Sequence, residues 1–232
     1  ARSGVQADVN LVASAGAVVF DKSVLDDVFE FGGLRGSSDI VLENNDGVPA
    51  GVELQVGFND ASTTFSGELR GLGSLTKTGS GTLTLAKAAT YSGATTVLGG
   101  TLKLGVNDAI PLGSPMLLQT PSGPVTFDLG GFKTRLFDLQ GTTTSVVDNG
   151  SVLSGELTLG DSNVDITFAG VMKNTAGALA LTKVGTANLV LTGDNTYTGK
   201  TTVKNGDVVI GDGGLLGSLV SVSYTHLTLP TI

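Results

Sequence analysis

The chain has 232 residues, of which 35 are Gly, 29 are Thr and only 34 are Asp, Glu, Lys or Arg. It has no Cys, no Trp and a single His, which excludes disulfide scaffolds, thiolate metal sites, Cys nucleophiles and nearly every His-dependent triad. The net charge of −8 has the wrong sign for a nucleic-acid groove or an anionic membrane surface, so we expect no nucleic-acid partner.

The N-terminal part of the chain predicts no membrane helix. Its longest apolar stretch, residues 11–20, is about half the length that a membrane-spanning helix requires. Residues 21–31 are predicted as strand, because their end, Val28-Phe29-Glu30-Phe31, alternates with period two. The sequence begins at Ala1, so we expect any targeting segment to lie upstream.

An internal repeat dominates the rest of the sequence. Residues 75–105 align without a gap on residues 181–211, at an offset of 106. The similarity extends outward: residues 54–57 match 157–160 at an offset of 103, and residues 34–36 match 139–141 at 105. Such small changes in offset indicate short insertions in the turns, while the strands of the two copies remain equivalent. The chain is therefore predicted to be two copies of a cassette of about 105 residues.

Short strands fill each cassette. Residues 82–85, 101–104 and 208–210 each place aliphatic side chains on one face and mostly Thr or Lys on the other. Gly- and Asn-rich corners separate them, since these residues tolerate positive φ. Only 5% of the residues are aromatic, which favours stacked coils with aliphatic ladders over a sandwich or barrel. We predict a parallel β-solenoid with 20–25 residues per coil and about five coils per cassette.

Residues 73–105 closely resemble the autotransporter-associated β-strand repeat of type V secretion passengers, and residues 181–211 match it almost as well. Residues 127–132, Phe-Asp-Leu-Gly-Gly-Phe, resemble an element that often lies between such repeats. The resemblance covers most of residues 40–221 and implies a right-handed parallel β-helix. It also implies export through the protein's own C-terminal outer-membrane β-barrel, which is missing from this chain, and residence at the cell surface. It implies no catalytic residue.

The C-terminal end departs from the repeat pattern. We expect residues 1–221 to form one β-helix passenger segment. Residues 222–232 resemble translated adaptor sequence and are predicted to be non-native. In that case the one His, His226, is not part of the natural protein.

Three kinds of pattern resemble functional sites, and the sequence favours a structural explanation for each. Residues 194–201 approximate a phosphate-binding loop, but a Val-rich strand follows where that site needs a helix. Asp161 and Asp165 would share a face of a strand, and Asp26 and Asp27 are adjacent, but solvated corners explain both pairs. Residues 44–47 and 211–214 are more typical of turns than of calcium sites.

Two further features also have structural explanations. Residues 149–151 form an N-glycosylation sequon, yet Asn-Gly is equally a corner sequence. Tyr91 and Tyr197 occupy the same position in both cassettes, where each ring is expected to cover the edge of a coil. We therefore predict no catalytic, cofactor-binding or metal-binding residue, and no small-molecule cofactor.

These observations predict a non-enzymatic passenger segment at the surface of, or secreted by, a Gram-negative-type bacterium. It would act as a β-helical stalk or scaffold, with adhesion to host or matrix glycans or proteins and assistance to its own secretion as compatible roles. The alternative is a β-helix lyase or glycosidase acting on polysaccharide, which would require carboxylates about 5–9 Å apart in a polar groove.

Overall fold

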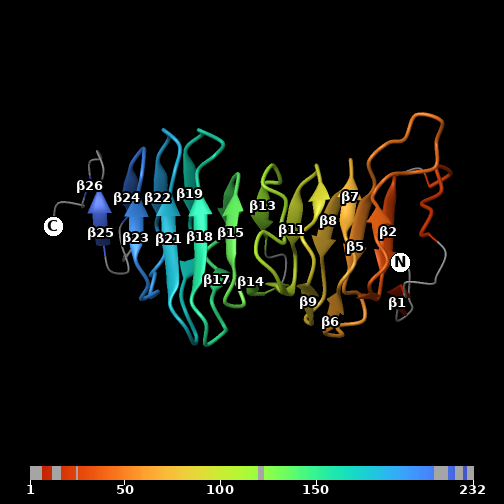
Figure 1. Cartoon of the computed structure of the whole chain (residues 1–232), viewed down its shortest axis with the longest axis horizontal. Helices are drawn as coiled ribbons and strands as arrows, with labels where there is room; N and C mark the ends of the chain where they lie inside the picture. The colour runs from red at the N-terminus through yellow and green to blue at the C-terminus, as the bar shows by residue number, and fades with distance from the viewer. Residues whose placement is uncertain are drawn as a thin grey trace.

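The chain forms an elongated stack of coils. The computed structural model describes residues 7–11, 17–24, 26–119 and 123–211, together with the backbone of the strands at 219–222 and 227–228. The strands lie across the long axis, and the chain runs from one end of the rod to the other (Figure 1). The described residues contain strands, turns and bends but no helix, and so no helix that could cross a membrane. The prediction of an all-β parallel solenoid is confirmed.

Three faces make up each coil. One face is an eight-stranded sheet of β1 (Asp8–Leu11), β3 (Gly33–Gly36), β6 (Thr63–Phe65), β9 (Thr82–Leu85), β12 (Gly100–Leu104), β14 (Val125–Asp128), β17 (Ser145–Asp148) and β20 (Val171–Met172). The second is a ten-stranded sheet of β2 (Val28–Phe31), β5 (Glu53–Val56), β8 (Ser74–Lys77), β11 (Thr95–Val97), β13 (Met116–Leu118), β16 (Leu139–Gly141), β19 (Ile166–Phe168), β22 (Leu189–Leu191), β24 (Val208–Ile210) and β26 (Leu227–Thr228).

The third face consists of two sheets joined by an irregular stretch. The first contains β4 (Ile40–Val41), β7 (Leu69–Gly71) and β10 (Thr90–Tyr91), and the second contains β15 (Lys133–Leu136), β18 (Gly155–Leu159), β21 (Leu179–Lys183), β23 (Thr201–Val203) and β25 (Leu219–Val222). Residues 106–110 continue this face between them. Ala89 N donates to Ala109 O at 3.2 Å, and Asp108 N donates to Lys133 O at 2.8 Å.

Coil length varies more than the sequence suggests. Facing residues are 19 positions apart where Thr82 pairs with Thr101, and 29 apart where Gly36 pairs with Phe65. The longest coil contains the loop of residues 42–52, which closes on itself through an antiparallel bridge between Glu43 and Gly51. The expected range of 20–25 residues therefore describes the typical coil and misses this insertion.

The core is the predicted ladder of apolar side chains. Along the eight-stranded face, consecutive coils stack Leu83, Leu102, Phe127, Val147 and Met172, and all five are buried. Burial of one such side chain contributes about 1.5–3 kcal/mol. The coils are thus held together by a continuous apolar column and by hydrogen bonds between neighbouring strands.

The structure corrects one predicted element. Only Val28–Phe31 of residues 21–31 is a strand. Ahead of it the chain turns, because the Asp21 carboxylate accepts a hydrogen bond from Ser23 N at 2.8 Å and Asp27 has a φ of 49°. The expectation of a non-native tail at residues 222–232 falls almost wholly outside the described residues, and it stays a prediction.

The two cassettes occupy different faces of the rod. In the first copy, β8 and β11 belong to the ten-stranded face, whereas their counterparts β21 and β23 belong to the third face. From β8, four full turns along the ten-stranded sheet lead to β19. The chain then passes through β20 on the eight-stranded face to β21 on the third face, which adds two-thirds of a turn. One cassette therefore makes four and two-thirds turns, in agreement with the expected number of about five coils. Equivalent residues of the two cassettes point toward neighbouring faces.

Candidate functional site

Buried lysines close two corners of the solenoid. The Lys77 side chain is 1% exposed, and its Nζ donates to the carbonyl oxygens of Thr78, Gly79 and Gly99 at 2.5, 3.0 and 3.1 Å. Two of these carbonyls belong to its own corner, and that of Gly99 belongs to the next coil. The ammonium group therefore satisfies three backbone oxygens and ties two coils together.

Lys183 repeats this arrangement in the second cassette. It is also 1% exposed, and its Nζ donates to Val184 O, to Gly185 O at 2.9 Å and to Asn205 O at 3.3 Å. Burial lowers the pKa of Lys77 to about 8, an effect that attraction to Asp60 partly opposes. Burial also lowers the pKa of Lys183, against attraction to Asp207 and Asp165.

The sequence contains a signal for these lysines. Leu75 and Lys77 are two residues apart in a strand and so share its inward face. The same parity places Lys183 inward with Leu181. A Lys at an inward position in both cassettes indicates a buried amine with a specific set of acceptors.

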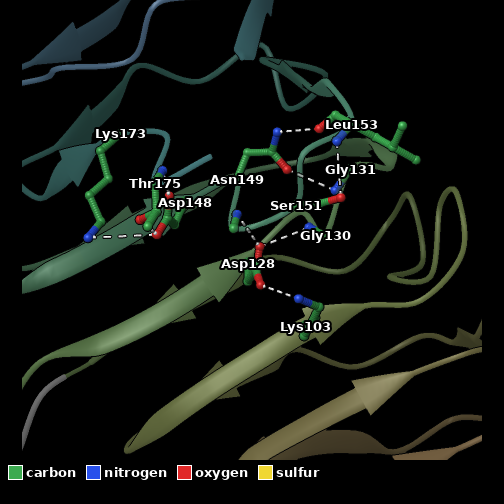
Figure 2. A network of polar contacts seen from close by, with 11 residues as sticks. Lys103, Asp128, Gly130, Gly131, Asp148, Asn149, Ser151, Leu153, Lys173 and Thr175 are labelled. Atoms are coloured by element: carbon green, nitrogen blue, oxygen red, sulfur yellow. Dashed lines mark hydrogen bonds and ion pairs between the residues drawn. The ribbon is translucent and has the colours of Figure 1, made fainter. Parts of the chain in front are cut away.

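The most extensive polar network lies at the corner after β14 and β17 (Figure 2). Asp128 and Asp148 are register partners in adjacent coils, and each is 8% exposed. The Asp128 carboxylate accepts hydrogen bonds from Lys103 Nζ, Gly130 N and Gly150 N at 2.8–2.9 Å. Asp148 accepts from Thr175 N and Thr175 Oγ1 at 2.8 and 2.5 Å, and Lys173 lies 3.7 Å away.

Asn149 occupies the centre of this network and is fully buried. Its Oδ1 accepts from Gly131 N at 2.8 Å, and its Nδ2 donates to Leu153 O, Gly177 O and Ala178 O at 2.7–3.0 Å. The sequon at residues 149–151 thus contains an amide nitrogen that is engaged by the fold, as the corner interpretation predicts.

The network holds its carboxylates in structural roles. Burial pushes the pKa of Asp128 upward, but Lys103 and the N–H groups of Gly150 and Gly130 outweigh it and hold the pKa below its usual value. Asp128 is therefore ionised and fully occupied at neutral pH. Lys103 lies beside Asp128 and Lys173 lies beside Asp148, so the two adjacent carboxylates are flanked by one lysine at each end across four coils.

Asp161 and Asp165 contact different coils. Asp161 accepts hydrogen bonds from Nε and Nη2 of Arg135 in the preceding coil, and Asp165 Oδ1 accepts one from Asn188 N of the following coil at 2.8 Å. Each carboxylate thus bonds in the opposite direction along the rod. Within the described residues, this geometry supports two cross-coil contacts more directly than a shared acid–base site.

Asp26 and Asp27 lie at the edge of an open groove of about 270 Å³, which Glu53 and Gly73 also line. Asp27 Oδ1 accepts from Asn44 Nδ2 at 3.0 Å, and Asp26 lies 3.5 Å from Val28 N. Over the described part of the chain, no three His, Cys, Asp or Glu side chains are grouped so that they could hold a metal ion.

The remaining candidates form corners and strands. Residues 201–203, which follow the phosphate-loop-like sequence, form β23 and not a helix. Asn44 Oδ1 accepts from Asp46 N and Ala50 N at 3.3 and 3.0 Å, which makes residues 44–47 a turn. Most of the calcium candidate at residues 211–214 lies outside the described residues.

Both tyrosines point into the core. Tyr91 is 1% exposed and its hydroxyl lies 2.5 Å from Thr95 Oγ1, which in turn lies 2.8 Å from Ser114 Oγ. Tyr197 is 2% exposed, with its hydroxyl 2.7 Å from Thr201 Oγ1. Burial raises the pKa of Tyr91. These rings pack inside the coil ends and do not form an exposed platform.

Columns of Thr mark the outward surfaces of the faces. Thr82, Thr101 and Thr126 stack on the eight-stranded face, and Thr158, Thr182 and Thr202 stack on the third. Thr76 donates to Glu53 Oε1 at 2.6 Å, and its counterpart Thr182 donates to Glu156 Oε1 at 3.2 Å. Thr76 and Thr182 are only 4% and 6% exposed, so the hydroxyl groups at the surface come from the other outward Thr side chains.

Two comparisons with known proteins match this chain. A family model described as passenger-associated-transport-repeat matches residues 75–104 and 181–210, which are the two copies of the internal repeat. The adhesin BmaC autotransporter of Brucella suis biovar 1 (strain 1330) is 35% identical over 178 residues, covering 71% of this chain and 5% of the relative. The chain thus spans about a twentieth of that relative's length. No solved structure matched the chain.

Both matched segments begin at the strands whose lysines close the corners, and the resemblance inferred from the repeat is confirmed. Both copies of the internal repeat match the family model, and an autotransporter adhesin is related over 71% of this chain, so the chain carries two copies of the passenger-associated-transport-repeat.

Proposed function

We propose that this chain is a β-solenoid segment of an autotransporter passenger and acts as an adhesive stalk at the surface of a Gram-negative bacterium. The observation that carries the proposal is the coincidence of the repeat with the coils. The two matched segments are the segments that stack through buried lysines. The adhesin named among the relatives supports contact with host or matrix glycans or proteins.

A non-enzymatic role is part of this proposal. The described acids of the corner network are bonded to lysines or to backbone N–H groups, and Asp161 and Asp165 bond to separate coils. Among the described residues, the one buried side-chain oxygen or nitrogen atom without a partner is Thr134 Oγ1. Such satisfied corners favour a scaffold over a reactive centre. A glycan panel incubated with the chain should release no reducing ends or unsaturated products.

Secretion is the second part of the proposed role. Each buried lysine receives its third carbonyl from the next coil, so a coil is completed only when its neighbour is in place. Coils that fold on one another outside the cell would favour onward movement of the chain through its own outer-membrane barrel, which lies outside this sequence.

Binding to cells or matrix tests the adhesive role. The purified chain is titrated over immobilised epithelial cells and extracellular-matrix proteins, with an unrelated parallel β-solenoid of similar size and charge as the control. We expect saturable binding of this chain and none of the control. Equal binding of both proteins, or none of either, would contradict adhesion by this segment.

A further inference from the structure

Exposed apolar side chains gather at one corner of the rod. Nine large apolar side chains of the described residues are exposed, and five of them lie at the corner between the third face and the ten-stranded face. These five form what we term the corner ridge: Val48 (87% exposed), Leu72 (56%), Leu112 (51%), Phe137 (38%) and Val164 (66%). They lie two to five residues before β5, β8, β13, β16 and β19, so they occupy five of six consecutive coils.

Hydrogen bonds between neighbouring coils place these corners one above another. Leu72 N donates to Glu43 Oε1 in the loop that carries Val48, at 3.1 Å, and Ser92 Oγ donates to Leu72 O at 3.3 Å. Further along, Met116 N donates to Asp138 O and Ser162 N donates to Phe137 O, both at 3.1 Å. The ridge is interrupted at one coil, where Ser92 takes the apolar position.

The internal repeat does not account for the ridge. Because the second cassette is turned by one face, equivalent positions lie at different corners. By the sequence offsets, the counterpart of Phe137 is Gly32 and that of Val164 is Ala61, while Val48 corresponds to Ser151. Leu112 has a Leu counterpart, Leu216, but these other three follow the corner in space and not a position in the repeat. A patch that is independent of the repeat indicates a contact surface.

We propose that the corner ridge is a lateral contact surface that seats the same ridge of a second copy of this chain. Ridge positions are one coil apart, about 4.8 Å, except that Leu72 and Leu112 are two coils apart across the Ser92 corner, and the ridge extends over roughly 24 Å. A partner that contacts all of it must present apolar groups at the same spacing over the same length. A second ridge has this spacing, and ridge against ridge is a self-complementary contact that closes at two copies.

The area of the ridge sets the strength of this contact. Side chains exposed to this degree present roughly 500 Å² together, the size of the largest apolar patch on a typical monomer. A pair of ridges would bury about 1,000 Å², which is at the lower end for a specific interface. The pairing is weak between free chains and gains strength when many copies are held on one surface. It is independent of binding to host or matrix.

Sedimentation equilibrium of the purified chain over a wide range of concentrations tests the pairing. We expect the mass to rise from one copy toward two. The triple variant Leu112→Ser, Phe137→Ser, Val164→Ser should weaken the association at least tenfold. The matched control, Phe58→Ser, Val152→Ser, Leu153→Ser, removes exposed apolar groups at other corners and should associate like the parent. Circular dichroism and thermal melting confirm that both variants are folded.

A cysteine cross-link locates the contact. The chain has no Cys, so Leu112→Cys, near the middle of the ridge, should form a disulfide-linked dimer under mild oxidation, whereas Val152→Cys should remain monomeric. A chain that stays monomeric at every concentration overturns the proposal, as do unlimited growth beyond two copies and equal losses in both triple variants. A monomeric chain whose ridge variant loses host binding would instead assign the ridge to that partner.

Discussion

At the scale of single residues, the corners depend on buried side chains that form the hydrogen bonds which water would otherwise form with the backbone. Lys77 and Lys183 each satisfy three carbonyls, and Asn149 satisfies three carbonyls and one N–H group. A buried carbonyl without a donor costs about 1–3 kcal/mol, so each of these side chains has an outsized effect on the coil that contains it.

Replacement of Lys77 by Met removes the ammonium but keeps most of the side-chain volume. We expect the free energy of unfolding to fall by about 2–4 kcal/mol, because three carbonyls lose a charged donor. Urea titration followed by circular dichroism measures the loss. Lys200→Met, at an exposed position, is the control and should stay within about 0.5 kcal/mol of the parent.

The lowered pKa of Lys77 predicts the sign of a pH effect. Below pH 8 the amine is charged in both the folded and the unfolded chain. Between about pH 8 and the unfolded pKa of about 10.4, the unfolded chain binds more protons, so the stability contributed by this residue rises with pH. Unfolding free energies measured from pH 7 to 9.5 should rise more steeply for the parent than for Lys77→Met. Parallel curves would contradict this assignment.

Asp128 provides a residue-scale test on the acidic side. Asp128→Ala leaves the Lys103 ammonium and two backbone N–H groups without their acceptor, so we expect a loss of about 2–4 kcal/mol at pH 7. The pKa of Asp128 is lowered in the folded chain, so the difference from the parent should shrink as the pH falls below about 4. Asp194→Ala, at an exposed corner, should show neither effect.

At the scale of the strand, inward and outward positions alternate as the sequence predicts. Leu83 and Leu85 of β9 are 1% and 2% exposed, whereas Thr82 and Thr84 of the same strand point outward. Leu83→Asp with Leu85→Asp should abolish folding, because two charges would lie in the apolar ladder without partners. Thr82→Asp with Thr84→Asp should retain β-structure and cooperative melting. Folding of the first variant would contradict the inward assignment.

Period-two alternation and the repeat were enough to predict the strands, the corners and the coil stack. They did not predict the partners of the corner side chains, because these come from neighbouring coils whose register depends on small insertions. Asp128 and Asp148 are 20 residues apart and meet only because their coil has that length. The site prediction was limited in the same way. Asp161 and Asp165 are four residues apart and would share one face of a strand, but their partners Arg135 and Asn188 lie in different coils.

At the scale of the whole molecule, each coil contacts only the coils beside it, so stability should be close to a sum over coils. Deletion of residues 75–94 removes one complete turn, because Leu75 and Thr95 are register partners. β5 would then stack directly on β11. We expect this variant to fold into a shorter rod. Its unfolding free energy should depend less steeply on urea concentration than that of the parent, because less surface is buried.

Deletion of half that length is the matched comparison. Removal of residues 75–84 would join β7 to the end of β9 and shift the following strands out of register. We expect loss of cooperative melting in this variant, with calorimetry as the measurement. Equal stability of the two deletions would show that coil length is not what sets the stack.

A cassette of four and two-thirds turns returns to its starting face only after three copies, or fourteen turns. In a chain with more cassettes of this length, a surface group encoded once per cassette would lie on a different face in each successive cassette. Such groups would follow a spiral along the rod. Such a rod would present the same groups to an approaching surface on every side, whatever the rotation of the rod about its long axis. Because each cassette makes a non-integral number of turns, duplication of one cassette is enough to present the same groups on all three faces.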